Sequence, residues 1–315
     1  MISRIAKWVR LWALSTFATA LFSSSAVAQD KLKVVVTIPD LADLVQEVGG
    51  ERVAVTTICR GKENLHAVTP RPSHLVALSK ADLFVQIGLS LETSFVPGLI
   101  EQCGNAKVKP GGAGFVNGSE GWSAIDVPRD LSRQGGDLHP QGNPHMNLDP
   151  RAGRHLVERI YAGLCRVDAA SKPLYTERRD AYLTRLAVAE ERWSKLGASW
   201  KGKPVVVYHQ EYSYLIARYE LAPCGAIESK PGIPPTPNHI AELVGRMKAA
   251  NCATILTAIW SNGDQVERVA EATGARTVEL PNMCGGIAGS ETWIGMMDLV
   301  HRRLDEAIGM SAPQK

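Results

Sequence analysis

The sequence predicts an α/β protein made of two lobes, each with a parallel sheet, joined by one long rigid helix. Short apolar runs rich in β-branched residues alternate with helical stretches in both halves of the chain, which is the pattern of β-α-β units. Between the halves, residues 173–200 form the longest helical stretch. With 315 residues, 45% hydrophobic and 21% charged, the chain is long enough for about two ordinary domains.

The first half is predicted to hold three strands that alternate with helices. Residues 33–38 (KVVVTI) are too uniformly apolar for a half-exposed strand and therefore indicate a buried parallel strand. Further strands are predicted at residues 52–59 and 83–88, and helices at residues 41–48, 72–80 and 151–167. Residues 109–142 are rich in Gly, Ser, Asp and Pro, and we expect a long loop there.

The second half repeats this alternation after the long helix. Strands are predicted at residues 205–208, 253–257 and 276–280, and helices at residues 212–219, 237–249, 265–273 and 291–308. We therefore expect an N-terminal α/β lobe (29–172), an interdomain helix (173–200) and a C-terminal α/β lobe (201–315).

The first 28 residues have the layout of a cleavable secretory signal. A basic stretch ends at Arg10, an apolar run too short to span a membrane comfortably follows, and the segment ends in AVA. We expect cleavage after Ala28 and, since no Cys lies just after this site, a periplasmic chain without a lipid anchor. Three of the 35 Lys and Arg lie in this segment, so 32 face 32 Asp and Glu in the rest, which argues against nucleic-acid binding.

Six cysteines lie in the exported part, and an oxidising compartment permits disulfide bonds among them. They are Cys59, Cys103, Cys165, Cys224, Cys252 and Cys284. None forms a C-x-x-C pair, which disfavours a cysteine zinc ribbon or a redox motif. We expect disulfide bonds whose pairing the sequence does not assign, with Cys165 as the first candidate for a free thiol.

Three of the eight histidines occupy positions from which imidazoles can converge on a metal. His66 follows the second predicted strand, His145 lies just before a predicted helix, and His209 directly follows a strand. Strand ends and loop-to-helix junctions are where ligand groups of α/β proteins gather. His139 is either an accessory ligand or a solvated residue. The remaining histidines lie in predicted helices without a partner four residues on: His74, His155, His239 and His301.

Several segments occur in a fixed order along residues 31–310. They are residues 64–66 (NLH) with 71–73 (RPS), 142–150 (GNPHMNLDP), 208–209 (YH), 228–235 (ESKPGIPP), and 280–281 (LP) with 285–286 (GG). Together they resemble the solute-binding proteins of zinc and manganese ABC importers, the family that includes zinc-uptake binding proteins and metal-binding adhesins. The resemblance implies two α/β lobes, one metal in the cleft between them, and delivery of that metal to an ABC permease in the inner membrane.

By this resemblance, the first three metal ligands are His66, His145 and His209. Family members with His at the third position are mostly zinc binders, whereas manganese binders tend to carry a carboxylate there. Imidazole nitrogens suit Zn²⁺, while Mn²⁺ prefers sites rich in oxygen. We therefore expect Zn²⁺ as the transported ligand, with Mn²⁺ as the second choice.

The fourth ligand departs from the family pattern, because Asn282 stands about where many members have an Asp. Three alternatives are open. Asn282 orients a water molecule that completes the tetrahedron, or a carboxylate such as Glu228 or Glu211 reaches the metal, or Cys284 coordinates as a thiolate. The water is the preferred alternative. The loop of residues 109–142 departs as well, since it holds a single His where zinc binders often have many.

The sequence thus predicts a monomeric periplasmic zinc-binding protein that supplies an ABC permease and is not an enzyme. A manganese-binding homologue, a metal-dependent adhesin and a zinc chaperone are the alternatives. An exported zinc hydrolase is the remote one, because three His and an open water position also describe a catalytic zinc site. Glu211 is the sequence-adjacent candidate base for such an enzyme, but we expect it to be an exposed loop residue. The H-E-x-x-H and G-x-S-x-G motifs are absent from the sequence.

Overall fold

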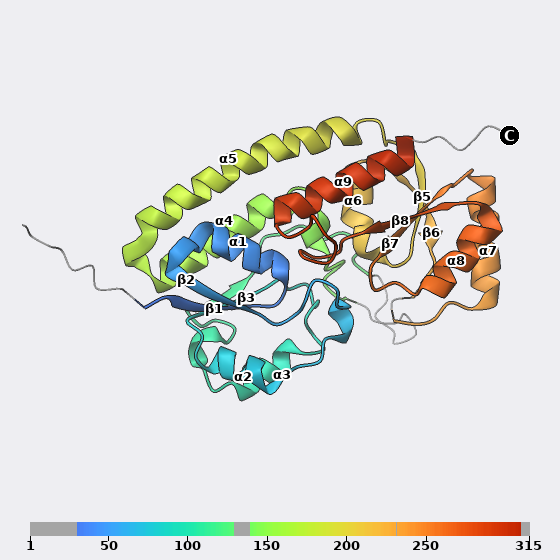
Figure 1. Cartoon of the computed structure of the whole chain (residues 1–315). Coiled ribbons are helices and arrows are strands. Elements are labelled where there is room, and N and C mark those ends of the chain that lie inside the picture. The colour runs from blue at the N-terminus through green and yellow to red at the C-terminus, as the bar shows by residue number, and fades with distance from the viewer. Residues whose placement is uncertain (1–29, 129–138, 231, 310–315) are drawn as a thin grey trace, which may run out of the picture. The chain divides into compact units, whose positions relative to one another are not determined.

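Two four-stranded parallel sheets organise the part of the chain that the computed structural model describes, residues 30–128, 139–230 and 232–309 (Figure 1). The first sheet has the strand order β2-β1-β3-β4 and the second the order β6-β5-β7-β8. Helices cover the sheets, so the predicted α/β class with two parallel-sheet lobes is confirmed. The predicted secretory signal, residues 1–28, lies outside the described residues.

The element bounds follow the sequence pattern closely. The strands are β1 (Leu32–Val36), β2 (Val53–Thr57), β3 (Leu83–Gln86), β4 (Phe115–Asn117), β5 (Pro204–Val207), β6 (Ala222–Ala226), β7 (Thr254–Ala258) and β8 (Arg276–Leu280). The helices are α1 (Pro39–Gly49), α2 (Pro72–Ser79), α3 (Val96–Gln102), α4 (Ala152–Val167), α5 (Lys172–Gly197), α6 (Ser213–Arg218), α7 (Pro237–Ala249), α8 (Gly263–Thr273) and α9 (Trp293–Gly309).

In each sheet the first strand along the chain is an inner strand, paired with its successor on one side and with a later strand on the other. β1 pairs with β2 and β3, and β5 pairs with β6 and β7, all in parallel register. Valines fill both strands because inner parallel strands are covered on both faces. The strand order therefore reverses beside β1 in the first sheet and beside β5 in the second. Open α/β sheets bind ligands at the carboxyl ends of the strands at such points.

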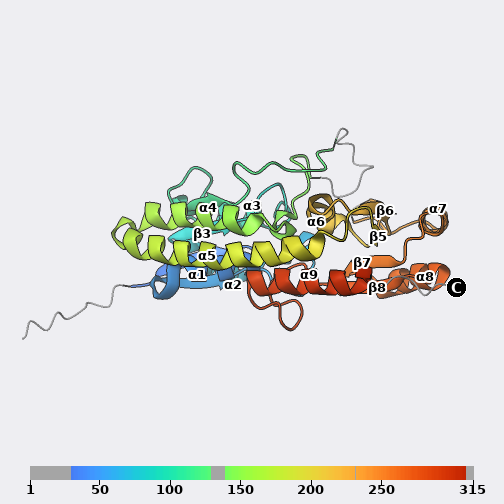
Figure 2. The ribbon, with the colours of Figure 1, turned by 90° about the horizontal axis from the view of Figure 1, so that it is seen from above.

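The long helix α5 links the lobes, as predicted, and packs against α1, α4 and α9 (Figures 1 and 2). Trp193 of α5 lies edge-on to Trp293 and stacks on His301, with ring centroids 5.8 and 5.2 Å apart. Its indole N–H donates to Asp298 Oδ1 over 2.7 Å. One continuous apolar core runs from the first sheet through these helices to the second sheet. The two lobes therefore share buried contacts and are not connected by the helix alone.

Three elements were missing from the sequence prediction. The loop expected at residues 109–142 contains β4, a three-residue edge strand, and its residues 129–138 lie outside the described chain. β6 was missed because APCGA has no β-branched residue, and its Pro is tolerated because the strand lies at a sheet edge, where the register shifts by a bulge. α3 begins with Val-Pro-Gly, which predicts a turn, although Pro is favourable in the first helical turn.

All six cysteines lie in the described chain and are free thiols, so the expected disulfide bonds are wrong for this structure. Most are buried and behave as small apolar groups with a weak donor. The thiol of Cys103 donates to Ile100 O over 3.3 Å, and that of Cys252 to Thr254 O over 3.6 Å. Burial raises the pKa of the Cys252 thiol to about 12, which suppresses the thiolate that disulfide exchange requires.

None of the helices in the described part of the chain is both long enough and apolar enough to cross a membrane.

Candidate metal centre

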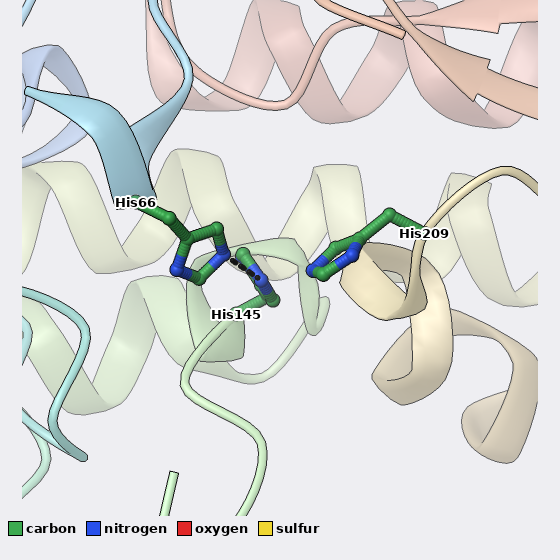
Figure 3. A group of neighbouring side chains, drawn as sticks. All are labelled: His66, His145 and His209. Carbon is green, nitrogen blue, oxygen red and sulfur yellow. Dashed lines mark hydrogen bonds between the residues drawn. The ribbon is translucent and has the colours of Figure 1, made fainter. Parts of the chain in front are cut away.

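His66, His145 and His209 come together where the two lobes meet, with their imidazoles turned toward one another (Figure 3). One nitrogen from each ring lies within 4.8 Å of the other two. The Nε2 atoms of His66 and His145 are 3.2 Å apart. Zn–N bonds of about 2.0–2.1 Å place two nitrogens of a tetrahedral site roughly 3.3 Å apart. Among the described residues, this is the one group of three or more His, Cys, Asp or Glu side chains arranged to hold a metal ion.

His66 is positioned by the turn that precedes it. It belongs to a 3₁₀ helix, Leu65–Ala67, in the connection between β2 and α2. The side chain of Asn64 caps this helix, because its Oδ1 accepts the backbone N–H of His66 over 2.9 Å. The carboxyl end of β2 and this cap together direct the imidazole toward the second lobe.

Asn143 positions His145 and connects it to the other lobe. Its Oδ1 accepts the backbone N–H of His145 over 3.0 Å, and its Nδ2 donates to the carbonyl of Gln210 over 2.8 Å. The Tyr214 hydroxyl donates to the carbonyl of Asn143 over 2.8 Å. The segment that carries His145 is thereby fixed to Gln210, which directly follows His209, and to Tyr214 of α6.

His209 is the second residue after the end of β5, and its side chain is 3% exposed. Its Nδ1 lies 2.6 Å from Oε2 of Glu228, which is also buried. The other oxygen of Glu228 accepts the backbone N–H of Gly232 over 3.1 Å. A carboxylate on Nδ1 fixes the ring and leaves Nε2 for a metal, the arrangement common in metal-binding histidines. Glu228 therefore orients His209 and has both oxygens engaged.

Burial keeps two of the three imidazoles in the neutral form that binds metal. It lowers the pKa of His66 to about 3, with smaller contributions from the nearby His209 and His139. It also lowers the pKa of His145 far below its usual value, with His66, His209 and His139 adding to the effect. A neutral imidazole offers a lone pair without first losing a proton.

His139 lies next to the three-histidine group without belonging to it. Its ring centroid is 5.1 Å from that of His66, and its Nδ1 lies 3.2 Å from the carbonyl of Ser90. A pocket of about 390 Å³ opens here, with His66, His139 and Leu91 in its lining. His139 is thus half-buried beside His66 and is not simply solvated.

The structure separates the candidates for the fourth position. Asn282 is 3% exposed; its backbone carbonyl accepts Asn147 Nδ2 over 3.0 Å, while its side-chain Oδ1 has no partner among the described residues. Cys284 is buried, and its backbone N–H donates a hydrogen bond to Asp40 Oδ2 over 3.0 Å. Burial, reinforced by the negative charges of Asp40 and Asp43, raises the pKa of the Cys284 thiol well above its usual value. A thiolate ligand from Cys284 is therefore disfavoured.

Glu211 is not the exposed loop residue that the sequence led us to expect. It is 1% exposed, in the 3₁₀ helix Gln210–Tyr212, whose last residue is fully buried. The Tyr212 hydroxyl donates to the carbonyl of Leu280 over 2.9 Å, which holds this helix against the end of β8. Burial raises the pKa of the Glu211 carboxyl, partly offset by the nearby His209.

The two asparagines that position the histidines were not singled out from the sequence. Asn64 and Asn143 each lie two residues before a histidine of the three-histidine group, and each accepts that histidine's backbone N–H. An Asn-x-His spacing, in which the Asn side chain closes a turn on the backbone two residues later, is the signal that could have revealed them.

Comparison with known proteins agrees with this architecture. The model of the family described as zinc-uptake complex component A, periplasmic, matches residues 34–307. The chain is 24% identical over 282 residues to the high-affinity zinc uptake system protein ZnuA of Bacillus subtilis (strain 168), covering 88% of this chain and 86% of the relative. It is 27% identical over 272 residues to the manganese-binding lipoprotein MntA of Halalkalibacterium halodurans, covering 84% and 85%.

A third relative, the iron-binding protein YfeA of Yersinia pestis, is 23% identical and covers 98% of this chain and 100% of its own. The relatives therefore differ in the metal that their names give. Several are named lipoproteins, which disagrees with the expectation of a chain without a lipid anchor. In this sequence the first cysteine is Cys59, inside the first lobe.

Solved structures share the fold. A crystal structure of ZnuA superposes with a TM-score of 0.72 at 20% identity, covering 89% of this chain and 100% of that one. A manganese-bound periplasmic metal-binding protein from Candidatus Liberibacter asiaticus gives a TM-score of 0.73 at 16% identity, covering 88% and 100%. Since the family model spans most of the chain, this protein belongs to the zinc-uptake component A family of metal-binding, ABC-importer solute-binding proteins, which are not enzymes.

Proposed function

We propose that this protein binds Zn²⁺ outside the cytoplasm and delivers it to the permease of an ABC importer. The observation that carries the proposal is the set of three imidazole nitrogens within 4.8 Å of one another, contributed by His66, His145 and His209. An all-imidazole set of this size suits Zn²⁺, whereas Mn²⁺ and other hard cations prefer oxygen donors. Mn²⁺ is the second choice, since the names of some relatives refer to that metal.

The N-terminal sequence and the names of the relatives support delivery to an importer. The signal-like first 28 residues direct export, and several relatives are named metal ABC transporter substrate-binding lipoproteins. We infer that the protein acts as a monomer in the periplasm. An adhesin or a free zinc chaperone would use the same site without a permease.

A metal competition experiment tests the choice of zinc. The purified protein is mixed with one equivalent of Zn²⁺ and one equivalent of Mn²⁺ per chain, so that the two metals together exceed the sites, and native mass spectrometry reports which metal is bound. We expect one zinc per chain and no manganese. The variant His209→Glu replaces a nitrogen donor with a carboxylate and should shift the bound fraction toward manganese. Preference of the unmodified protein for manganese would overturn the assignment of zinc.

Delivery is tested in cells that lack the gene. Growth in medium depleted of zinc by a chelator should be restored by the full-length gene and not by the His145→Ala variant expressed at the same level. Equal rescue by both genes would show that zinc delivery does not use this site.

A further inference from the structure

We propose that the carboxylate of Glu211 is the fourth donor to the bound metal, in place of Asn282. This inference rests on the proposed function, because it concerns the same metal site. It assigns the position that the three histidines leave open.

Glu211 is a buried carboxyl group without a hydrogen-bond donor among the described residues. Its side chain is 1% exposed, and no other described residue donates a hydrogen bond to either of its oxygens. Carboxyl groups in protein interiors are normally paired with a cation or with several donors, because burying them otherwise is costly. His209, a histidine of the proposed metal site, lies two residues earlier in the chain. A cation held by His209 would supply the missing counter-charge.

Two more buried acceptor oxygens without a hydrogen-bond partner among the described residues lie in segments that hydrogen bonds connect to that of Glu211. The side-chain Oδ1 atoms of Asn282 and Asn147 are also buried and without a hydrogen-bond partner among the described residues. Asn147 lies two residues after His145, and its Nδ2 donates to the carbonyl of Asn282 over 3.0 Å. The Tyr212 hydroxyl holds the helix of Glu211 to Leu280, two residues before Asn282. These hydrogen bonds connect the segments that carry Glu211, Asn147 and Asn282, and each segment holds a buried acceptor oxygen without a partner among the described residues.

The charge of the site favours a carboxylate over an amide. Three neutral imidazoles leave a bound Zn²⁺ with its full charge of +2 in a buried position. One carboxylate reduces this charge and binds Zn²⁺ far better than the neutral oxygen of Asn282. No carboxylate oxygen of Glu211 belongs to the group of ligand atoms that lie within 4.8 Å of one another. Its flexible side chain must therefore rotate toward the metal as the metal binds.

The other carboxylate near the site is already committed. Glu228 places one oxygen 2.6 Å from His209 Nδ1 and the other 3.1 Å from the backbone nitrogen of Gly232. Moving it to the metal would break both contacts and release the ring of His209. Glu211 can move without breaking any hydrogen bond to another residue, which makes it the better donor.

The experiment compares Glu211→Gln with the same substitution at Glu267, an exposed residue of α8. Zinc affinity is measured for the purified proteins by competition with a chromophoric chelator. We expect Glu211→Gln to keep one zinc per chain but to bind it at least about tenfold more weakly, and Glu267→Gln to match the unmodified protein. A crystal structure of the zinc-loaded protein should place a Glu211 oxygen about 2.0–2.2 Å from the metal.

Two results would overturn the inference. One is unchanged zinc affinity in Glu211→Gln, and the other is a zinc-loaded structure with a water or Asn282 at the fourth position. If His209→Ala still abolishes tight binding in that case, the proposed function stands and only the role of Glu211 fails. If the unmodified protein binds no zinc tightly, both fail together. Should Glu211→Gln not fold, as judged by circular dichroism without metal, the zinc-loaded structure decides alone.

Discussion

Glu228 Oε2 lies 2.6 Å from Nδ1 of His209, and both side chains are buried. This contact joins the end of β5 to the segment after β6, and it determines which nitrogen of the imidazole is available to a metal. The ring orientation of His209 is thus fixed within the C-terminal lobe before any metal arrives.

Loss of this contact should weaken zinc binding without removing the site. In Glu228→Ala, His209 loses the group that fixes its ring and its tautomer, so we expect zinc affinity to fall about 10–100-fold at unchanged stoichiometry. Chelator competition measures the change, with Glu242→Ala on the exposed side of α7 as the control. An unchanged dissociation constant would show that the carboxylate does not support the ligand.

Asn143 should contribute to stability as well as to binding. In Asn143→Ala, the backbone N–H of His145 and the carbonyl of Gln210 each lose a hydrogen-bond partner. We expect the free energy of unfolding to fall by about 1–3 kcal/mol, measured by urea denaturation without metal. The matched variant Asn64→Ala removes the single cap of the short helix at His66 and should cost about 1 kcal/mol. Equal losses would contradict the bridging role of Asn143.

The metal-free protein should lose stability as the pH falls below neutral. The pKa of His66 is lowered to about 3 in the folded state, whereas an exposed histidine in the unfolded chain titrates near 6.5. Between these values the unfolded state binds more protons than the folded state, so stability falls with falling pH throughout this window. Urea midpoints at pH 7.5 and pH 5 should differ less in His66→Gln than in the unmodified protein. An equal difference between the two urea midpoints in His66→Gln and in the unmodified protein would exclude a contribution of His66 to the pH dependence.

The cysteines should all be titratable as thiols. Protein unfolded in guanidinium without reductant is expected to react with six equivalents of a thiol reagent, because all six cysteines are free in the structure. In the folded protein the reaction should be slow, since most of the thiols are buried. Four equivalents or fewer in the unfolded protein would show that a disulfide bond forms.

The sequence predicted the architecture because parallel sheets leave a strong local signal. Apolar runs such as that of β1, and the single long helix α5, are recognisable without tertiary information. β6 was missed because its Pro and Gly are unfavourable in a strand except at the edge of a sheet. Whether a strand lies at an edge depends on the whole sheet and not on the local sequence. The convergence of His66, His145 and His209 was predicted because strand ends and a family resemblance pointed to the same three positions.

The parts of the site that were not predicted depend on contacts between distant segments. Glu211 is buried in a short helix that Tyr212 connects to Leu280, 68 residues away, and nothing near Glu211 in the sequence indicates this contact. The free state of the cysteines likewise depends on where each thiol lies in the packed core. Local sequence specifies the candidates, and tertiary packing decides which of them can act.

The central claim is tested most directly by zinc titration of five alanine variants. His66→Ala, His145→Ala and His209→Ala each remove a histidine of the proposed metal site, whereas His155 hydrogen-bonds with the carbonyl of Gly118 and His301 lies in the tryptophan cluster of α5 and α9. Chelator competition with native mass spectrometry should show one tightly bound zinc in the unmodified protein, in His155→Ala and in His301→Ala, and its loss in the other three. Equal effects of all five substitutions on zinc affinity would contradict the assignment of the site.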